Sequence, residues 1–392
     1  MRLRVKISKV EPGRYPEPIE CPYCHSRAVK LHQGGCSKAV RDLTYEEVEV
    51  QRQRCLSCRR TFRVYPEGVS RGQQSQALKA LSVMLYLLGL SYGAVTDVLE
   101  VMGALLGKPV QLGKTTVYRN VQEAGEKARR LRRRWLEGGK RVRVIGADIT
   151  QVKCGGESLL VGVVVDDRTG IELSVEILED ETTESLLAWL KEVADLVGAE
   201  VVVTDDADGL KTVADDLDLA HQICRAHVTK NTLRLVGELG TQAMEAPHPP
   251  PPGVNKGVEE FLADLEEVQR LIESHPHDGQ ARMKALHLAY CQAPPPGEGE
   301  KATMWYRMRL LTLDRWENWP RLTLYQRWRG PQGERIDGTN NGAERAIGWW
   351  VKERYRSMRG YKRRESVLNV STLLGWLGAQ TADYDLAELV AA

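Results

Sequence analysis

The sequence has no long hydrophobic run and few cysteines for its length. Among its 392 residues, no apolar stretch reaches the ~18 residues that a membrane-spanning helix needs, and the opening MRLRVKISKV lacks the hydrophobic segment of a secretory signal. Eight cysteines are too few for a disulfide framework in such a chain, and four of them form two CxxC pairs. We therefore expect a soluble cytoplasmic protein without membrane contacts, built from two to four domains.

The formal net charge of +2 hides an uneven distribution along the chain. The first 140 residues carry 26 Lys and Arg against 13 Asp and Glu, whereas residues 141–227 carry 7 against 19. Residues 228–335 balance at 14 of each sign. The basic front favours a polyanionic partner such as DNA, and the acidic middle favours a site that holds cations.

Residues 1–70 carry a pattern typical of a zinc ribbon. The CPYC sequence supplies Cys21 and Cys24, and the CLSC sequence supplies Cys55 and Cys58. Each pair can offer two sulfurs from one tight turn, and four thiolates satisfy the tetrahedral preference of Zn²⁺. Alternating residues between the pairs predict a strand. We expect one structural zinc ion, which either only stabilises a small lobe or also holds in place a surface that faces DNA.

Residues 71–140 are predicted to be helical, with breaks at Gly89 and Gly93. A further helix begins after Gly113, and a separate arginine-rich helix follows it. A short helix, a turn and a helix that opens with polar residues are typical of a helix-turn-helix, although a plain helical linker is the alternative. The expected DNA contacts are Lys114, Thr115, Thr116, Tyr118, Arg119, Arg132, Arg133 and Arg134.

Residues 141–227 are predicted to form an α/β domain with the element order β-β-β-α-β-α-β. The strands are expected at 141–152, 158–165, 171–178, 200–204 and 220–224, and the helices at 183–196 and 209–216. This order is that of a ribonuclease H-like core, in which the first and fourth strands lie side by side. Asp148 in the first strand and Asp205 at the end of the fourth could then meet at one edge of the sheet.

Two carboxylates at one edge repel each other unless a cation neutralises them. Mg²⁺ (or Mn²⁺) takes oxygen ligands, and two such ions ~3.5–4 Å apart can hold the attacking and leaving oxygens of a phosphodiester. Glu344 can supply a third carboxylate. Asp206 and Asp208 are expected to be solvated or to cap the next helix, and Asp166, expected in a turn, is the main rival ligand.

Residues 228–335 are predicted to form an all-α insertion, and residues 336–380 the last helices of the catalytic core. Trp316 and Trp319 are either core residues or stack on a flipped DNA base. A helix that follows Glu344 is strongly basic, and the alternative to DNA contact is a solvated face. Its expected DNA-backbone contacts are Lys352, Arg356, Arg359 and Arg363.

Asp148, Asp205 and Glu344 resemble the DDE triad of bacterial insertion-sequence transposases. The segment from Asp205 through Gly209-Leu210, followed by Cys224-x-x-His227, is similar to the Mutator-like transposases. The distance to Gly209 in this pattern identifies Asp205, and not Asp206, as the second acidic residue of the triad. The resemblance covers roughly residues 141–360. It implies a supporting role for Cys224 and His227 beside the active site. The pattern of Asn341 three residues before Glu344 also fits a helix cap with its capping-box partner.

The resemblance implies a DDE transposase that cleaves DNA at transposon ends and transfers the freed strand to target DNA. Its expected partners are double-stranded DNA and a second copy of the chain in a homodimer or larger assembly, within the nucleoid of a prokaryotic cytoplasm. One alternative is another ribonuclease H-like nuclease, such as a junction resolvase. The other is a catalytically inactive DNA-binding regulator that descends from a transposase.

Overall fold

The computed structural model describes residues 5–108, 110–358, 360–378 and 384–390. The chain divides into two compact units that interleave along the sequence. Unit 1 comprises residues 1–138, 151–159 and 346–392, and unit 2 comprises residues 139–150 and 160–345. Within the described ranges, none of the helices combines the length and apolar character needed to cross a membrane.

Unit 1 begins with a small antiparallel sheet around the cysteine pairs. Its strands are β2 (Val29–Ala39), β3 (Glu47–Cys55) and β4 (Thr61–Val64), in that order across the sheet. Alternate residues of β3 are buried, as the predicted strand between the CxxC pairs requires. A second, parallel pair joins β1 (Val5–Lys6) to β10 (Tyr384–Asp385), so the two ends of the chain belong to one unit.

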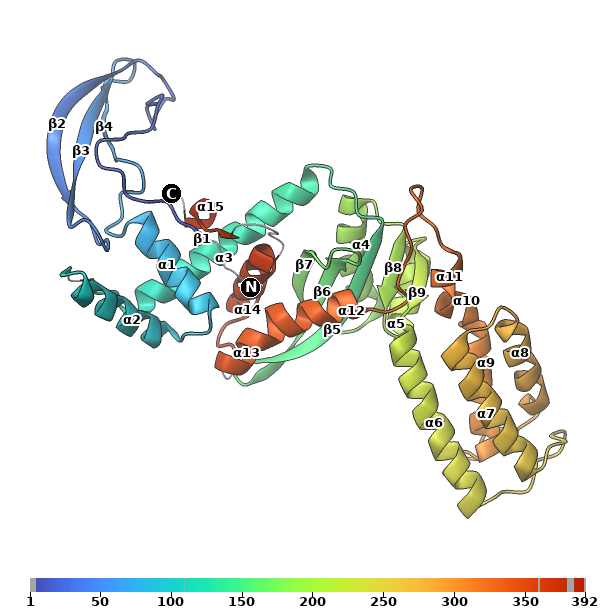
Figure 1. Ribbon diagram of the computed structural model, residues 1–392. Helices are drawn as coiled ribbons and strands as arrows, with labels where there is room; N and C mark the ends of the chain where they lie inside the picture. The colour runs from blue at the N-terminus through green and yellow to red at the C-terminus, as the bar shows by residue number, and fades with distance from the viewer. Residues whose placement is uncertain (1–4, 109, 359, 379–383, 391–392) are drawn as a thin grey trace. The chain divides into compact units, whose positions relative to one another are not determined.

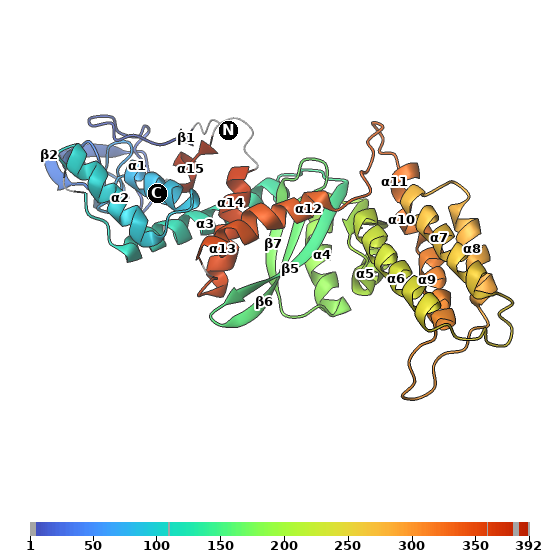
Figure 2. The same cartoon turned by 60° about the horizontal axis from the view of Figure 1, so that its bottom comes forward.

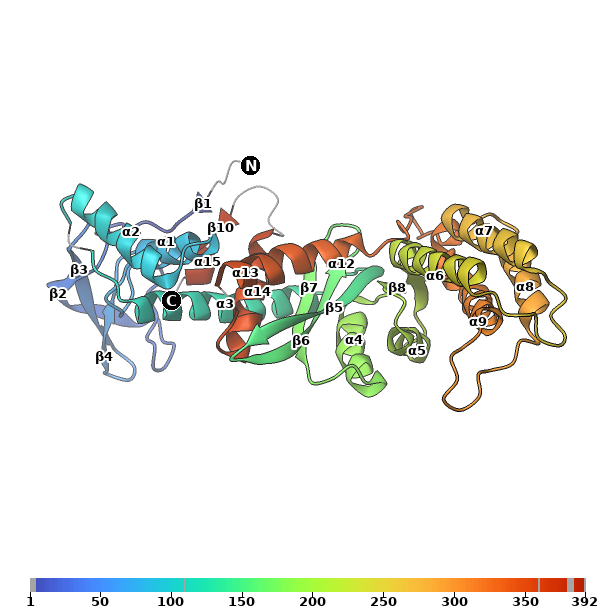
Figure 3. The ribbon, with the colours of Figure 1, turned by 90° about the horizontal axis from the view of Figure 1, so that it is seen from below.

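The helices of unit 1 pack around one long helix, as Figure 3 shows for α1 and α2 beside α3. The break expected at Gly89 is present, because this residue has a positive φ of 109° directly after α1. The break expected at Gly93 is wrong, since Gly93 lies inside α2. These helices are α1 (Gln76–Leu87), α2 (Tyr92–Leu105), α3 (Lys114–Glu137), α14 (Arg364–Gly378) and α15 (Ala387–Val390).

The helix-turn-helix region differs from its prediction in one respect. The helix that opens at Lys114 and the arginine-rich helix are one continuous α3 of 24 residues. Its buried positions recur every three or four residues from Val117 to Leu136, so a single apolar stripe runs through the segment that was expected to contain a break.

Unit 2 contains a five-stranded mixed sheet, visible beside α4 and α5 in Figure 1. The strand order is β7-β6-β5-β8-β9, with β5, β8 and β9 parallel and β6 antiparallel to β7. This confirms the predicted ribonuclease H-like arrangement, in which the first and fourth strands of the domain are neighbours. The strands are β5 (Val144–Cys154), β6 (Glu157–Asp166), β7 (Glu172–Leu178), β8 (Val201–Thr204) and β9 (Ala220–Ile223).

Two helices connect the later strands of this sheet. Helix α4 (Thr183–Val197) is capped by the Thr182 side chain and buries the apolar face expected from its sequence. Helix α5 (Asp208–Asp216) follows the acidic segment directly. The short β8 is buried at all four positions, which explains its run of β-branched residues: it is a central parallel strand covered on both faces.

The predicted all-α insertion is also present in unit 2, and Figure 2 shows its longer helices side by side. Its core contains Phe261, Tyr290 and Trp305, whose rings pack with centroids 5.1–6.1 Å apart. The helices are α6 (Arg225–Glu245), α7 (Val258–Ser274), α8 (Gly279–Tyr290), α9 (Met304–Glu317), α10 (Trp319–Leu322) and α11 (Leu324–Arg327).

Sheet and insertion form one packed body within unit 2. The buried Gln222 side chain on β9 donates to the Leu322 carbonyl at 3.1 Å and accepts from the Tyr325 amide at 2.8 Å. Helix α6 begins one residue after Cys224, so the expected boundary at residues 227 and 228 falls inside a helix.

The last helical region comprises α12 (Asn341–Ala346), the π-helical η1 (Ile347–Lys352) and α13 (Glu353–Met358).

Candidate active site

Asp148 lies in β5, and Asp205 directly follows β8, the neighbouring parallel strand. Each paired residue of β5 lies 57 positions before its partner, from Val144 with Val201 to Gly146 with Val203. The same offset joins Asp148 to Asp205. The negative charge of Asp205 contributes to the raised pKa of Asp148, so the two carboxylates are close enough to interact.

The electrostatics of Asp148 show which other groups share this edge. Burial, followed by the negative charges of Asp205 and Glu344, raises the pKa of Asp148 to about 6. The Ile149 amide, which donates to the Asp148 carboxylate at 2.8 Å, and His227 oppose the rise of this pKa. The three carboxylates expected from the sequence therefore belong to one electrostatic cluster.

A buried asparagine holds Glu344 in this place. The Asn340 side chain donates to the carbonyl of Ala147 at 2.9 Å, directly before Asp148. Its backbone amide donates to the Cys224 sulfur at 3.3 Å, and its carbonyl accepts from the Glu344 amide at 3.1 Å. Asn340 thus joins β5, the end of β9 and the start of α12.

Sequence reasoning missed Asn340 and considered only its neighbour as a helix cap. Asn341 is the first residue of α12 and is exposed, whereas Asn340 is fully buried. Two adjacent asparagines before a helix signal a cap, but only the long-range contact with Ala147 shows which of them is structural.

Cys224, His227 and Glu344 also converge. One ligand atom of each lies within 4.8 Å of the others. His227 Nδ1 is 3.6 Å from Glu344 Oε1, and Cys224 is fully buried at the N-cap of α6. The sequence predicted that the first two support the active site, and the structure places both beside Glu344.

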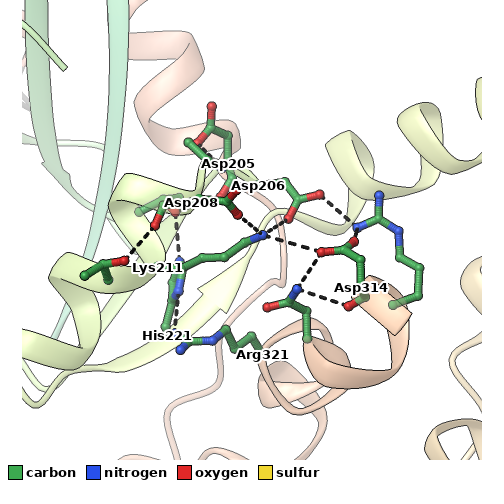
Figure 4. A network of polar contacts seen from close by, with 12 residues as sticks. Asp205, Asp206, Asp208, Lys211, His221, Asp314 and Arg321 are labelled. Atoms are coloured by element: carbon green, nitrogen blue, oxygen red, sulfur yellow. Dashed lines mark hydrogen bonds and ion pairs between the residues drawn. The ribbon is translucent and has the colours of Figure 1, made fainter. Parts of the chain in front are cut away.

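Asp206, the residue after Asp205, has a different environment from the one expected. Asp206 was predicted to be solvated or to cap a helix, but its side chain is only 14% exposed and forms ion pairs at 2.9 Å with Arg315 and 2.8 Å with Lys211. Figure 4 shows this network, in which Lys211 also reaches Asp208. Arg315 in turn donates to Thr232 on α6.

The role expected for Asp166 in a turn is consistent with the structure. Its carboxylate accepts hydrogen bonds from the amides of Arg168 and Thr169. Burial and the nearby charge of Asp337 raise the pKa of Asp167 to about 7, but this residue is not among the groups that perturb Asp148. Neither aspartate joins the described carboxylate cluster.

Comparison with known proteins finds a family to which part of the chain is similar. Residues 66–245 match the family described as Transposase, Mutator family. The matched segment is less than half of the chain. The match includes Asp148, Asp205, Cys224 and His227, and it ends before Glu344. No curated protein sequence matches the chain.

Solved structures that resemble the chain include viral integrase cores and a mariner transposase domain. The magnesium-bound catalytic core of HTLV-2 integrase is 17% identical and covers 32% of this chain and 83% of its own, with a TM-score of 0.19. The Mos1 mariner transposase catalytic domain is 12% identical over 40% and 91% of the two chains, with a TM-score of 0.20. At such scores, the ribonuclease H-like assignment rests on the strand order of the sheet itself.

The two CxxC pairs of the N-terminal lobe form a compact four-cysteine cluster. The sulfur atoms of Cys21 and Cys58 are 3.6 Å apart, those of Cys24 and Cys55 are 3.5 Å apart, and all four lie within 4.8 Å of one another. A tetrahedron with Zn–S bonds of ~2.3 Å places its sulfurs roughly 3.8 Å apart. The cluster therefore fits the zinc ion expected from the sequence.

Several residues expected to contact DNA are exposed on α3. Lys114, Thr115 and Arg119 are exposed at its first turns, and Thr116 and Tyr118 are half-buried. Further along, Arg133 and Arg134 are exposed, but Arg132 is only 5% exposed and its guanidinium lies over the Trp376 ring. Arg132 is therefore a packing residue, and its expected role in phosphate contact is wrong.

The basic segment after Glu344 is less uniformly exposed than expected. Arg356 and Arg363 are exposed, and the Arg363 guanidinium lies 5.7 Å from the Tyr118 ring centroid. Lys352 is half-buried, and Arg359 lies outside the described residues. Arg354, which lies between these residues in the sequence, is buried against Tyr86 and donates to the Gly89 and Leu90 carbonyls.

The two candidate stacking tryptophans are not equivalent. Trp319 is 4% exposed and packs so closely on Gly279 that a Cβ there would lie 2.0 Å from the ring. Its expected contact with a DNA base is therefore wrong, because the ring belongs to the helical core. Trp316 is half-buried, stacks on His287 with centroids 5.6 Å apart and lies under Lys284.

Proposed function

We propose that the chain is a DDE transposase that cleaves DNA at transposon ends and joins the freed strand to target DNA. The observation that carries the proposal is the convergence of Asp148, Asp205 and Glu344 in one electrostatic cluster. The Mutator-family match over residues 66–245 supports the same activity class. The three carboxylates are the residues to which we assign catalysis.

The cluster has the chemistry of a site for hard divalent cations. Its carboxylate oxygens are ligands that Mg²⁺ and Mn²⁺ prefer, and burial together with the charges of Asp205 and Glu344 raises the pKa of Asp148. We propose that Asp148, Asp205 and Glu344 hold two such ions. When bound, the ions supply electrostatic stabilisation of the phosphodiester and lower the pKa of water.

The protein groups position the reactants instead of forming covalent bonds with them. In the first step, water attacks the phosphorus at the transposon end, and the P–O3′ bond breaks to leave a 3′-hydroxyl. In the second step, that hydroxyl attacks a target phosphodiester, whose own 3′-oxygen leaves. Asn340 fixes the backbone on both sides of the cluster, which keeps Asp148 and Glu344 at a constant separation.

DNA recognition is assigned to the basic front of the chain. The zinc ribbon, the exposed start of α3 and the exposed arginines after Glu344 supply positive charge for phosphate contact. Because two transposon ends must be joined in one reaction, we propose a homodimer or larger assembly. We place this activity in a prokaryotic cytoplasm, at the nucleoid.

The test uses the full chain, zinc-loaded, with duplexes taken from both flanks of its gene. We expect Asp148→Asn, Asp205→Asn and Glu344→Gln each to lower cleavage and strand transfer by ~10³-fold or more, because each removes several kcal/mol of transition-state stabilisation. DNA binding, measured by gel shift, is expected to remain.

Asp208→Asn is the matched control for this series. Asp208 lies three residues from Asp205, its side chain is 97% exposed, and its substitution is expected to leave cleavage within about twofold. Normal cleavage by any one of the three triad variants would overturn the assignment. Cleavage of branched DNA without strand transfer would favour a resolvase, and binding without cleavage would favour an inactive regulator.

A further inference from the structure

Cys224, His227 and Glu344 form a second cluster with a ligand set different from that of the aspartates. They come from the N-cap of α6, its first turn and α12. We propose that they form a site for a soft divalent ion, Zn²⁺, with three protein ligands and one open position. Because Glu344 belongs to both clusters, zinc at this site would withdraw it from the carboxylate triad.

The distances fit a tetrahedral ion. Zinc bonds of ~2.0–2.2 Å to nitrogen and oxygen place the two ligand atoms roughly 3.4 Å apart. His227 Nδ1 and Glu344 Oε1 are 3.6 Å apart, which is too far for a good hydrogen bond and close to this separation. The Cys224 sulfur lies within 4.8 Å of both, so a small side-chain rotation completes the set.

His227 provides an independent sign that a partner belongs in this cluster. Its Nδ1 atom is buried, and within the described residues it has no hydrogen-bond partner. A buried ring nitrogen without a partner is costly, and ion coordination would satisfy it. The side chain as a whole is 40% exposed and that of Glu344 is 41% exposed, which leaves a route for an ion to enter.

Cys224 is held in a position suited to a metal thiolate. Its backbone amide donates to the Thr204 carbonyl at 2.7 Å, and its sulfur accepts from the Asn340 amide at 3.3 Å. These two hydrogen bonds fix the position of the Cys224 sulfur, which would bind a metal as the thiolate. The three-residue spacing in the first turn of α6 then directs His227 to the same side of the helix.

The chemistry of the ligands separates this site from the aspartate pair. Thiolate and imidazole favour zinc, whereas Mg²⁺ favours oxygen ligands and keeps its waters. Asp148 and Asp205 offer only oxygen. The zinc site therefore stands independently of catalysis, but its consequence, reversible inhibition of transposition by zinc, rests on the proposed function.

The first test is the zinc content of the full chain after saturation and removal of excess metal. We expect two zinc ions per unmodified chain, one in the four-cysteine cluster and one here, and a single ion in Cys224→Ser and in His227→Ala. Cys291→Ser, a half-buried cysteine on the insertion, is the matched control and is expected to keep two. One ion in the unmodified chain, or two in Cys224→Ser, would overturn the proposal.

A measurement on the unmodified chain tests the second zinc site even if the variants do not fold. Cadmium-113 NMR separates a site with four thiolates from a site with one, because each thiolate shifts the resonance strongly downfield. Two signals of different type are expected, and a single signal of the four-thiolate type would contradict the second site.

The inhibition is tested in the magnesium-dependent cleavage assay with added zinc. We expect the half-inhibitory zinc concentration to rise at least ~10-fold in Cys224→Ser, each variant being normalised to its own zinc-free rate. An unchanged value would overturn the competition for Glu344. If the unmodified chain cleaves no DNA with any metal, the proposed function fails, and the zinc content still tests the site.

Discussion

Two adjacent aspartates in the segment VVVTDDADG have opposite environments. The charge of Asp205 acts on Asp148, and Asp206 forms a half-buried ion-pair network with Arg315 and Lys211. The charge of these two partners outweighs burial and lowers the pKa of Asp206. Asp205 interacts electrostatically with Asp148, whereas Asp206 faces Arg315 on the insertion helix α9 and Lys211 on α5.

The Asp206 network predicts a loss of stability that Asp208 does not share. We expect Asp206→Asn to lower the free energy of unfolding by about 3–5 kcal/mol, because it leaves the buried Arg315 without one of its anions. Asp208→Asn is expected to change the same free energy by less than about 0.5 kcal/mol, since its carboxylate is 97% exposed. Urea denaturation followed by tryptophan fluorescence measures both, and equal effects would contradict the prediction.

His221 predicts a defined dependence of stability on pH. Burial, followed by the charge of Arg321, lowers its pKa from 6.5 to about 3, and its ring is hydrogen-bonded to Thr204 and Arg321. Below pH 6.5 the unfolded chain binds one more proton at this position than the folded chain. The stability that His221 contributes is therefore fully present above pH 6.5 and is lost as the pH falls toward 3.

The size of this effect is measured against His221→Gln. Between pH 7 and pH 5 the unmodified chain is expected to lose about 2 kcal/mol more unfolding free energy than the variant. The comparison is needed because the raised pKa values of Asp148 and Asp167 act in the opposite direction. Parallel pH profiles for the two proteins would show that His221 does not titrate as described.

At the scale of elements, the small sheet of β2, β3 and β4 depends on its metal site. The sheet has a limited core, with Val10, Val40, Val48 and Val69 as its buried cluster. A lobe of this size rarely folds on apolar burial alone, and structural zinc supplies ~10–16 kcal/mol of apparent binding free energy in small domains.

This dependence gives a test by local hydrogen exchange. Removal of zinc, or Cys55→Ser, is expected to raise amide exchange across residues 21–64 and to weaken DNA binding, with β8 and β9 still protected. Cys36→Ser is the control, because Cys36 lies on β2 outside the four-cysteine cluster. Protection that persists in the zinc-free chain would contradict a structural role for the ion.

Element packing also explains the errors about α3 and the insertion. From residue type alone, Arg132 was expected at the DNA surface, and Trp319 either there or in the core. Arg132 covers an aromatic ring, and Trp319 fills the space above Gly279. An arginine run or a tryptophan near a helix end gives the same sequence pattern whether it faces solvent or a neighbouring helix.

At the scale of the whole molecule, the chain order does not follow the compact units. Unit 1 joins the first 138 residues to the segment after residue 345, and β1 pairs with β10 across almost the full length of the chain. Helix α14 contacts α3 within this unit. A reading along the sequence divides such a chain into consecutive domains, because composition and spacing contain no information about which distant segments meet.

The sequence by itself determined the two cysteine pairs, the succession of strands and helices and the helical insertion. These follow from spacing and periodicity, which are local consequences of backbone geometry, whereas the choice of the three acidic positions came from the resemblance to DDE transposases. Only the tertiary structure decided that Asp206 binds Arg315, that Asn340 joins β5 to α12, and that Cys224 meets Glu344. The partners in these contacts lie more than a hundred residues apart, and packing of the unit 2 core, not sequence spacing, brings them together.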